Sequence, residues 1–435
     1  MNYTPIDYAN DIDEDLFIHK QYGKSLLQQT TPKDIPPRDD LQLWDNDFLP
    51  ELTTNLKIGS DASPEIKAQI ITIIKDNWDA FFEAGVRRPI LGFQFCIDTG
   101  ASEPVCCQQP SYGPHESKII QQQINALKHD GLIRECTGPW GSSIVLAPKP
   151  HQEDVTDITK YKWRMCISYR ALNARTLPFQ NPIPRCLDAN ENLGDATGRL
   201  HFISLDAHQG FHQIAVRALD QEKLAFFGPD GKKYTFVVMP FGPKNGPPVY
   251  TAMMRALKDE WDSHYLEWTH DTTTTYGSNT IIDDVLCWST SPNTLLAYFQ
   301  CICEIFVKYR ASFRLDKCKF FMDHVEYIGH DLTPAGNCPA QSKFDLINNW
   351  PLPSNRLNLH SFLGLCSFYS KYCPWFEVDV TPFRALIHHY RHKPIPITEW
   401  TTDNRNLFHT LKTYKTSSEE VNAVHALVCS TQSTL

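Results

Sequence analysis

Three carboxylates in apolar surroundings are the residues that most suggest chemistry. Asp206 ends the apolar run 202–205, and Asp283 and Asp284 interrupt the apolar run 281–286. Carboxylates flanked by strand-forming apolar residues are costly to bury unless a cation compensates their charge. A hairpin turn can present both adjacent aspartates to one cleft. The third aspartate can reach the same cleft from the end of a neighbouring strand. From spacing alone, the pair also fits an ordinary exposed hairpin turn.

An oxygen-rich site of this kind suits Mg²⁺, which keeps waters and substrate phosphates among its ligands. Two such ions, roughly 3.5–4 Å apart, can activate an attacking hydroxyl and hold the leaving oxygen in phosphoryl transfer. Phosphoryl transfer is therefore the chemistry that the three carboxylates would support.

Apolar periodicity predicts the elements that must position these residues. Strands are expected at 143–146, 163–167, 202–205 and 234–239, with a hairpin over 280–288 and a strand pair over 325–332. Helices are expected at 64–84, 117–130, 247–256, 295–309, 342–350 and 357–372, with Ser117 and Gly131 capping the second of them. Strands and helices mix without a βαβ rhythm, which favours an α+β architecture.

Composition sets limits on the class of protein. A chain of 435 residues is too long for one core, so several domains or subdomains are expected. No apolar run approaches the length of a membrane span, and the first residues do not resemble a secretory signal. The 14 cysteines include no Cys-x-x-Cys pair, which argues against a zinc knuckle and for reduced thiols in an intracellular protein.

The net charge of −9 is concentrated at the N-terminus. Residues 1–66 hold 13 acidic and 5 basic residues, whereas the other 369 residues hold 37 and 36. Basic residues gather locally over 149–175 and 308–319, and backbone phosphates need local positive surface rather than a basic protein. The same stretches also fit solvated charged faces.

A series of sequence blocks extends from about residue 64 to residue 412. The blocks include Gly138 to Ser143, Trp163 to Asn173, Phe202 to Ile214, Phe236 to Gly242 followed by Asn245, Ile281 to Asp284, Lys317 to Phe320, Tyr327 to His330, and Ser361 to Leu365 with Tyr369. In content and order they resemble the gypsy-type reverse transcriptases, which are encoded in the pol polyproteins of LTR retrotransposons. The resemblance implies a right-hand polymerase with fingers, palm and thumb subdomains and a partial connection.

The resemblance also implies the roles of single residues. The catalytic metal ligands would be Asp206, Asp283 and Asp284. Arg164 would contact the incoming triphosphate, Phe211 would exclude a 2′-hydroxyl, and Phe241 and Gly242 would line the nucleotide pocket. The primer grip would be Tyr327, Ile328 and Gly329.

The implied function is RNA- and DNA-directed DNA synthesis with two Mg²⁺ ions, for which Mn²⁺ could substitute. The partners would be an RNA or DNA template, a DNA primer and dNTPs, with no membrane. The expected location is the cytoplasm, within a retroelement particle, and the nucleus. The domain prediction is an acidic flexible leader (1–62), N-terminal helices and fingers (63–181), a palm (182–328) with inserted fingers strands (214–245), a thumb and connection (329–400), and the truncated start of an RNase H-proximal region (401–435).

Departures from the family pattern favour an alternative. Ile281 replaces the usual Tyr before the paired aspartates, and extra residues lie between Met254 and Ile281. An insertion before Trp163 leaves Lys149, Lys160 and Lys162 as candidates for the lysine that contacts the nucleotide. The alternative is a degenerate relic that at most binds nucleic acid.

One motif points to a different activity. Asp98-Thr99-Gly100 spells the signature of a retroviral aspartic protease, but the helix and fingers block follow too soon for a protease body. No later acidic constellation resembles RNase H, so neither activity is expected of this chain.

Overall fold

The computed structural model describes residues 56–81, 89–108, 110–149, 161–179, 181, 200–270, 274–333, 336–373, 375–390 and 393–413. Most of the expected leader and the candidate Lys160 therefore lie outside the described residues. The described residues form two compact units. One comprises those up to 181 together with 201–322, and the other comprises Leu200 and those from 323 onward. The subdomain boundaries expected from the sequence stay a prediction.

A five-stranded sheet forms the centre of the first unit. Its strands, in order across the sheet, are β1 (Lys57–Ile58), β12 (Lys319–Met322), β6 (His201–Asp206), β11 (Asp284–Ser289) and β10 (Tyr276–Ile281). The pairs formed by β12, β6, β11 and β10 are antiparallel, whereas β1 lies parallel to β12. The predicted strand and hairpin at the carboxylates are confirmed and become neighbours in one sheet.

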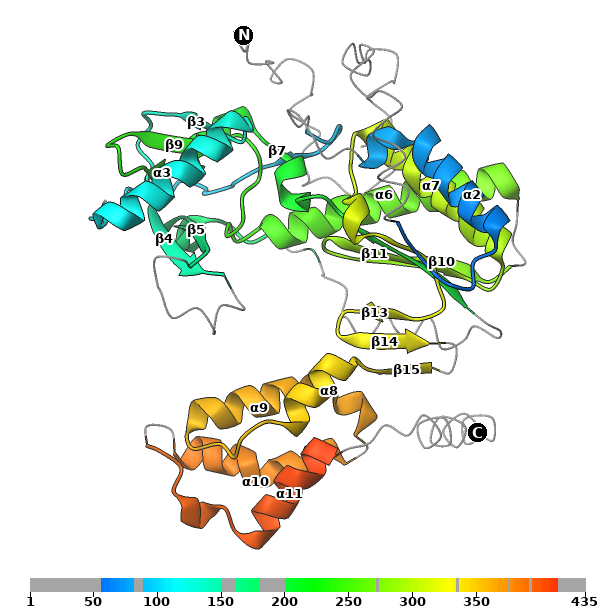
Figure 1. The fold of residues 1–435 in the computed structure, drawn as a ribbon. Helices are drawn as coiled ribbons and strands as arrows, with labels where there is room; N and C mark the ends of the chain where they lie inside the picture. Colours follow the sequence, from blue (N-terminus) through cyan, green and yellow to red (C-terminus); the bar gives the residue numbers. More distant parts are fainter. Residues whose placement is uncertain are drawn as a thin grey trace. The chain divides into compact units, whose positions relative to one another are not determined.

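Three helices lie along this sheet: α2 (Pro64–Asp76), α6 (Gly246–Thr269) and α7 (Pro292–Tyr309) (Figure 1). Helix α7 begins where the Ser291 side chain accepts a hydrogen bond from the Thr294 amide and ends at Arg310, which has a left-handed conformation. Helix α6 is much longer than the predicted 247–256. Leu257, Trp261 and Tyr265, four residues apart, are all buried, so the apolar stripe continues along one face.

The rest of the first unit consists of short elements. They are β2 (Gln94–Phe95), α3 (Pro114–His129), β3 (Ile133–Glu135), β4 (Ser143–Pro148), β5 (Trp163–Ser168), α4 (Arg170–Arg175), β7 (Ala215–Val216), β8 (Phe226–Phe227) and β9 (Lys233–Phe236), with 3₁₀ turns at Trp78–Phe81, Gly210–Gln213, Ala218–Leu224 and Leu315–Lys317. The strands pair as β4 with β5, β2 with β7, and β3-β9-β8. Strand β9 is shorter than the predicted 234–239.

Helix α3 begins three residues before the predicted Ser117, so that N-cap was wrong. Pro114 occupies the first turn, and the Gly113 amide donates to the Glu116 carboxylate at 3.0 Å.

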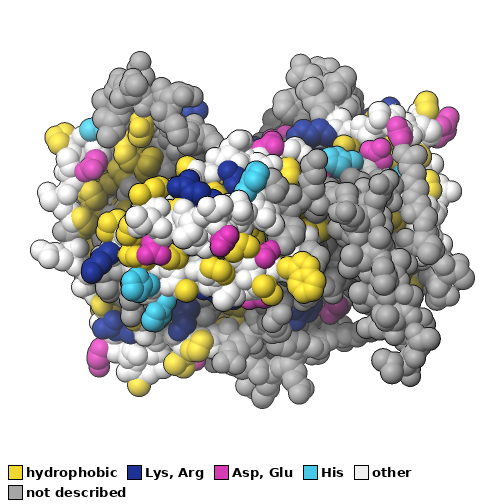
Figure 2. Space-filling model, turned by 90° about the horizontal axis from the view of Figure 1, so that it is seen from below, with side chains coloured by type: hydrophobic (Ala, Val, Ile, Leu, Met, Phe, Trp, Pro, Cys, Tyr) yellow, Lys and Arg dark blue, Asp and Glu magenta, His cyan; other side chains and the backbone are white. Residues whose placement is uncertain are grey.

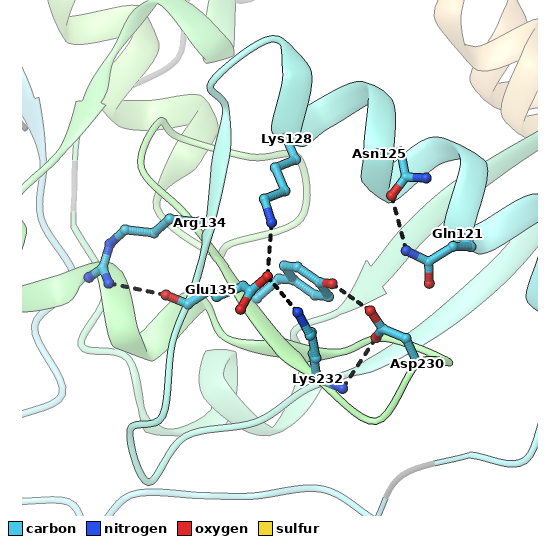
Figure 3. Close-up of polar contacts among 8 residues, drawn as sticks. Gln121, Asn125, Lys128, Arg134, Glu135, Asp230 and Lys232 are labelled. Atoms are coloured by element: carbon cyan, nitrogen blue, oxygen red, sulfur yellow. Dashed lines mark hydrogen bonds and ion pairs between the residues drawn. The ribbon is translucent and has the colours of Figure 1, made fainter. Parts of the chain in front are cut away.

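Polar contacts connect helix α3 to neighbouring segments (Figure 3). Lys128 and Lys232 both donate to the Glu135 carboxylate, at 2.8 and 3.0 Å. These side chains are exposed, so solvent screens both ion pairs and they contribute little to stability.

The second unit has its own apolar core. It contains β13 (Val325–Tyr327), β14 (His330–Thr333), β15 (Gly336–Pro339), α8 (Gln341–Asn348), α9 (Arg356–Phe368), α10 (Phe376–His389) and α11 (Thr402–Thr413), with 3₁₀ turns at Ser370–Tyr372 and Ile397–Glu399. Leu359, Phe362 and Phe383 are completely buried in this core. Strand β15 and helices α10 and α11 were not predicted.

The surface carries charges of both signs. On the face shown in Figure 2, basic and acidic side chains lie among apolar ones in several separate groups. None of the helices in the described part of the chain is both long and apolar enough to cross a bilayer.

Candidate active site

The register of the central sheet brings the three predicted carboxylates together. Asp284, the first residue of β11, lies directly opposite Asp206, the last residue of β6. Directly opposite residues of an antiparallel pair place their side chains on the same face. Asp283 lies in the turn between β10 and β11, and its carbonyl accepts a hydrogen bond from the Ala207 amide at 2.8 Å. The hairpin is therefore fixed to the end of β6, where the carboxylates meet.

The turn that carries Asp283 has an unusual backbone. Its other residue, Ile282, has a φ of +51°. β-branched residues rarely adopt this left-handed region, and such a conformation costs on the order of 1–3 kcal/mol. The sheet on both sides of the turn must hold it in place. Ile281, which replaces the family's Tyr, ends β10 and pairs with Asp284, so the hairpin forms with Ile at this position.

Asp283 has the most strongly perturbed carboxyl group of the three. Burial, followed by the charges of Asp206 and Asp284, raises the pKa of Asp283 to about 6. Loss of solvent and then the Asp206 charge raise the pKa of Asp284. The Oδ1 atom of Asp283 is buried and accepts no hydrogen bond from the residues that the structure describes. Both burial and the neighbouring carboxylates therefore disfavour the ionised form of Asp283.

Lys317 also belongs to the site, although no role was expected of it from the sequence. Its ammonium lies 3.2 Å from the Asp206 carboxylate and lowers the pKa values of Asp283 and Asp284. Lys317 is the last residue of the 3₁₀ turn Leu315–Lys317, which lies just before β12. The basic stretch 308–319 was a sequence signal for this residue, but its partner depends on the pairing of β12 with β6.

Tyr250 and Gly210 also belong to the site and were not predicted. The buried Tyr250 side chain comes from α6, and its hydroxyl faces Asp283, whose charge contributes to raising the Tyr250 pKa. A Cβ atom at Gly210 would collide with both the Tyr250 hydroxyl and the Asp283 carboxylate. Glycine is therefore required four residues after Asp206.

Aromatic rings adjoin the carboxylates. Phe211 is 8% exposed, and its ring meets those of Tyr250 and Phe241 edge-on, with centroids 5.2 and 4.9 Å apart. Phe241 is 58% exposed. Phe211 is thus held by its neighbours and packs on Tyr250, whose hydroxyl faces Asp283, whereas Phe241 presents a large apolar surface to solvent. Both positions fit the nucleotide pocket expected from the sequence.

Comparison with known proteins agrees with this geometry. Residues 147–332 match the family model for reverse transcriptase (RNA-dependent DNA polymerase), and all three carboxylates lie within the match. This region is a reverse transcriptase domain. The chain is 30% identical over 293 residues to the Pol polyprotein of the Drosophila melanogaster transposon 297, covering 67% of this chain and 26% of the relative. It is 26% identical over 332 residues to that of the Drosophila transposon gypsy, covering 75% and 30%.

The fold has solved counterparts. The foamy viral protease-reverse transcriptase in complex with an RNA/DNA hybrid matches with a TM-score of 0.67 and 21% identity, over 86% of this chain and 46% of the other. A form in complex with double-stranded DNA matches with a TM-score of 0.69 and 22% identity, over 84% and 59%. The predicted right-hand polymerase fold is confirmed. The chain spans about a quarter to a third of the length of its curated transposon relatives.

The other predicted nucleotide-binding residues of the reverse transcriptase domain lie outside the central sheet. Gly242 has a φ of +107°, and its carbonyl accepts a hydrogen bond from the Asn173 side chain at 2.9 Å. Arg164 is exposed on β5, opposite Ala147 on β4, in a sheet separate from that of the carboxylates. Lys149 and Lys162 extend the same strand pair through a backbone hydrogen bond of 2.8 Å. Arg164 and the lysines are not in the carboxylate cluster, and their predicted contacts stay predictions.

The expected primer grip lies in the second unit. Tyr327 ends β13, and Ile328 and Gly329 form the turn before β14, with φ values of +51° and +72°. The Tyr369 hydroxyl donates to the Gly329 carbonyl at 2.9 Å, and a Cβ at Gly329 would come equally close to that hydroxyl. Close packing against Tyr369 is therefore a second reason for glycine here, beside the predicted approach of a primer.

The protease-like segment folds as a turn in the first unit. The Asp98 side chain accepts a hydrogen bond from the Gly100 amide at 2.8 Å, and its carbonyl accepts one from the Leu177 amide. Two histidines of the family-like blocks pack against aromatic rings. His212 lies against Phe236 and Phe241, and the buried His330 is surrounded by aromatic rings of the second unit.

Reverse transcriptases generally use divalent metal ions, and the carboxylates fit such a group. The unpartnered Oδ1 atom and the raised pKa of Asp283 both indicate negative charge that a bound cation would neutralise.

We expect Asp283→Asn to stabilise the metal-free protein at pH 7.5. In the folded state the pKa of Asp283 is raised from 3.8 to about 6, so stability is lost as pH rises through this range. Asn cannot ionise and avoids that loss. Solvent screens part of the repulsion, so the gain should be on the order of 1 kcal/mol. Thermal unfolding in EDTA measures it, and the gain should shrink at pH 5. A less stable variant at pH 7.5 would contradict the electrostatic account.

Proposed function

We propose that this chain is an RNA- and DNA-directed DNA polymerase of a retrotransposon. The observation that carries the proposal is the β6–β11 register, which sets Asp206 opposite Asp284 and beside Asp283. Three carboxylates at the end of a sheet, with Lys317 paired to Asp206 and Phe211 packed on Tyr250, match the needs of nucleotidyl transfer. The family match and the similarity to nucleic-acid-bound reverse transcriptases support it.

The site would use two Mg²⁺ ions, or Mn²⁺ in their place, held by Asp206, Asp283 and Asp284. When bound, such ions activate the primer 3′-hydroxyl and neutralise the charge on the leaving pyrophosphate. The chain's own groups orient the substrates. Arg164 would bind triphosphate oxygens through its planar guanidinium, and Phe241 and Gly242 would line the pocket of the incoming nucleotide. Tyr327, Ile328 and Gly329 would hold the primer backbone.

The partners of this polymerase would be an RNA or DNA template, a DNA primer and dNTPs. Its place would be a retroelement particle in the cytoplasm, and the nucleus. The direct test is primer extension on poly(rA)/oligo(dT) with Mg²⁺. Incorporation of dTMP that requires both template and divalent ion supports the proposal. A folded protein that binds the template-primer but extends it with neither Mg²⁺ nor Mn²⁺ would contradict it.

Ile281 is the observation that favours the degenerate-relic alternative. It keeps the strand pairing of β10 but offers neither a hydroxyl nor a ring face to a primer terminus. A hydrogen bond to a polar or charged backbone group contributes up to roughly 1.5–3 kcal/mol. Its loss would slow catalysis by about one to two powers of ten without removing the carboxylates.

We therefore predict that Ile281→Tyr accelerates single-turnover extension at saturating nucleotide by about ten- to a hundredfold. Ile281→Phe separates the contribution of the ring from that of the hydroxyl, and Ile281→Val is the matched control that should leave the rate unchanged. A wild-type rate that increases with Tyr identifies a slow but working enzyme. Absence of extension in all forms, with template-primer binding intact, would identify the relic.

A further inference from the structure

A histidine, a cysteine and a glutamate meet on the packed helices α6 and α7. His264 belongs to α6, and Cys301 and Glu304 belong to α7. The imidazole nitrogen, the thiol sulfur and a carboxylate oxygen all lie within 4.8 Å of one another. The closest pair, His264 Nε2 and Glu304 Oε2, is 2.7 Å apart. We propose that these three side chains form a zinc-binding site distinct from the polymerase carboxylates.

The helices hold the three residues in place. Cys301 and Glu304 are three positions apart on α7, so they lie on the same face. On one side of the cluster, the rings of Tyr265 and Tyr298 pack edge-on, with centroids 5.4 Å apart. On the other side, Lys308 of α7 forms an ion pair with Glu260 of α6. Contacts on both sides fix the spacing of the two helix backbones at the cluster.

A fourth side chain orients the carboxylate. The Gln300 amide donates to Glu304 Oε1 at 2.9 Å, which leaves Oε2 directed toward His264. Hydrogen bonds of this kind to a ligand carboxylate commonly fix its orientation in metal sites. The arrangement therefore includes both ligands and a positioning residue.

The donor set selects the kind of metal. Imidazole nitrogen, thiolate sulfur and carboxylate oxygen are the ligands that zinc takes in proteins, whereas Mg²⁺ and Ca²⁺ prefer oxygen alone. Zinc bonds of roughly 2.0–2.3 Å separate neighbouring ligand atoms by roughly 3.3–3.8 Å. The nitrogen–oxygen contact of His264 and Glu304 must therefore lengthen from 2.7 Å to roughly 3.3 Å. Both side chains can adjust, because they are 40% and 38% exposed.

The thiol lies on the side of the site that solvent does not reach. Cys301 is completely buried, so an ion would enter between the half-exposed His264 and Glu304. Burial, followed by the Glu304 charge, raises the pKa of Cys301 to about 12, so the thiol is protonated without a metal. Zinc binding forms the Zn–S bond, breaks the S–H bond and releases the proton to solvent. Three protein ligands leave a fourth position for water.

Cadmium is the probe for this site, because a cadmium–thiolate bond gives an ultraviolet charge-transfer absorption that carboxylate sites cannot produce. The full chain is titrated with Cd²⁺ in excess Mg²⁺, with the exposed Cys106 and Cys166 replaced by Ser in every variant. The expected result is a saturable absorption that Zn²⁺ competes away. Cys301→Ser should abolish it, and His264→Ala or Glu304→Gln should weaken binding at least about tenfold.

Cys303→Ser is the matched control, because Cys303 is an equally buried thiol two positions along α7. It should keep the absorption. Zn²⁺ should also raise the unfolding temperature of the wild type and the control but not of Cys301→Ser. If Cys301→Ser does not fold, His264→Ala decides, since that side chain is half exposed. An absent absorption in the wild type, or unchanged affinity in His264→Ala, would overturn the proposal whatever the polymerase activity.

Discussion

An Asp206→Asn protein should bind a template-primer as tightly as the wild type and extend no primer. The substitution removes one of three carboxylates that the sheet register brings together, so the metal ions that polymerisation needs would be lost. Binding should persist because affinity for nucleic acid comes mainly from cationic side chains that contact phosphates elsewhere. Filter binding and primer extension on the same preparation measure the two properties separately.

Asp316→Asn is the matched control for this experiment. Asp316 lies in the 3₁₀ turn just before β12, but its carboxylate pairs with Arg314 rather than facing the other aspartates. We expect this variant to extend primers at the wild-type rate. If Asp206→Asn also extends primers normally, the assignment of the carboxylate site is wrong.

Phe211→Ala should relax the choice of sugar. Phe211 is nearly buried between Tyr250, which faces Asp283, and Phe241, so its ring is held in one place. Removing that ring would remove the clash with a 2′-hydroxyl. Ribonucleotide incorporation relative to deoxyribonucleotide should rise roughly tenfold or more, which corresponds to about 1.4 kcal/mol per factor of ten.

The measurement is the ratio of kcat/KM for a ribonucleotide and its deoxy counterpart on one template-primer. Phe211→Tyr keeps the ring and should keep the discrimination, which separates lost volume from a general disturbance of the pocket. An unaltered ratio in Phe211→Ala would place this residue outside the sugar-binding part of the site.

The sequence predicted the strand at Asp206 and the hairpin at Asp283, because both are short apolar runs with clear ends. It did not predict Lys317 or Tyr250. Each depends on pairing or packing between segments far apart in the chain, which local periodicity does not contain. The carboxylates were recognised because their neighbours formed family motifs, whereas Tyr250 looked like one more apolar residue of a helix.

The differences between the predicted and the observed helices have similar causes. The continuation of α6 to Thr269 was missed because charged residues separate its buried positions. Helix α10 contains Pro382, and a proline disfavours a helix that continues through it from the preceding turn. The cluster of His264, Cys301 and Glu304 could not be predicted, because it requires that α6 pack against α7 with one particular alignment.

The pairing of β1 with β12 has a consequence for how the protein is made. Lys57 Nζ donates to the Asp316 carbonyl, 259 positions later, and strand β12 in turn borders β6, which carries Asp206. Contacts this distant in sequence form late in folding, because a long loop must close before they can be gained. A nascent chain can therefore add β12 and β1 to the sheet only after residue 322 has left the ribosome. Until then, the edge of β6 that will pair with β12 is open to other strands. The unfinished chain can therefore aggregate through this edge while it is being synthesised.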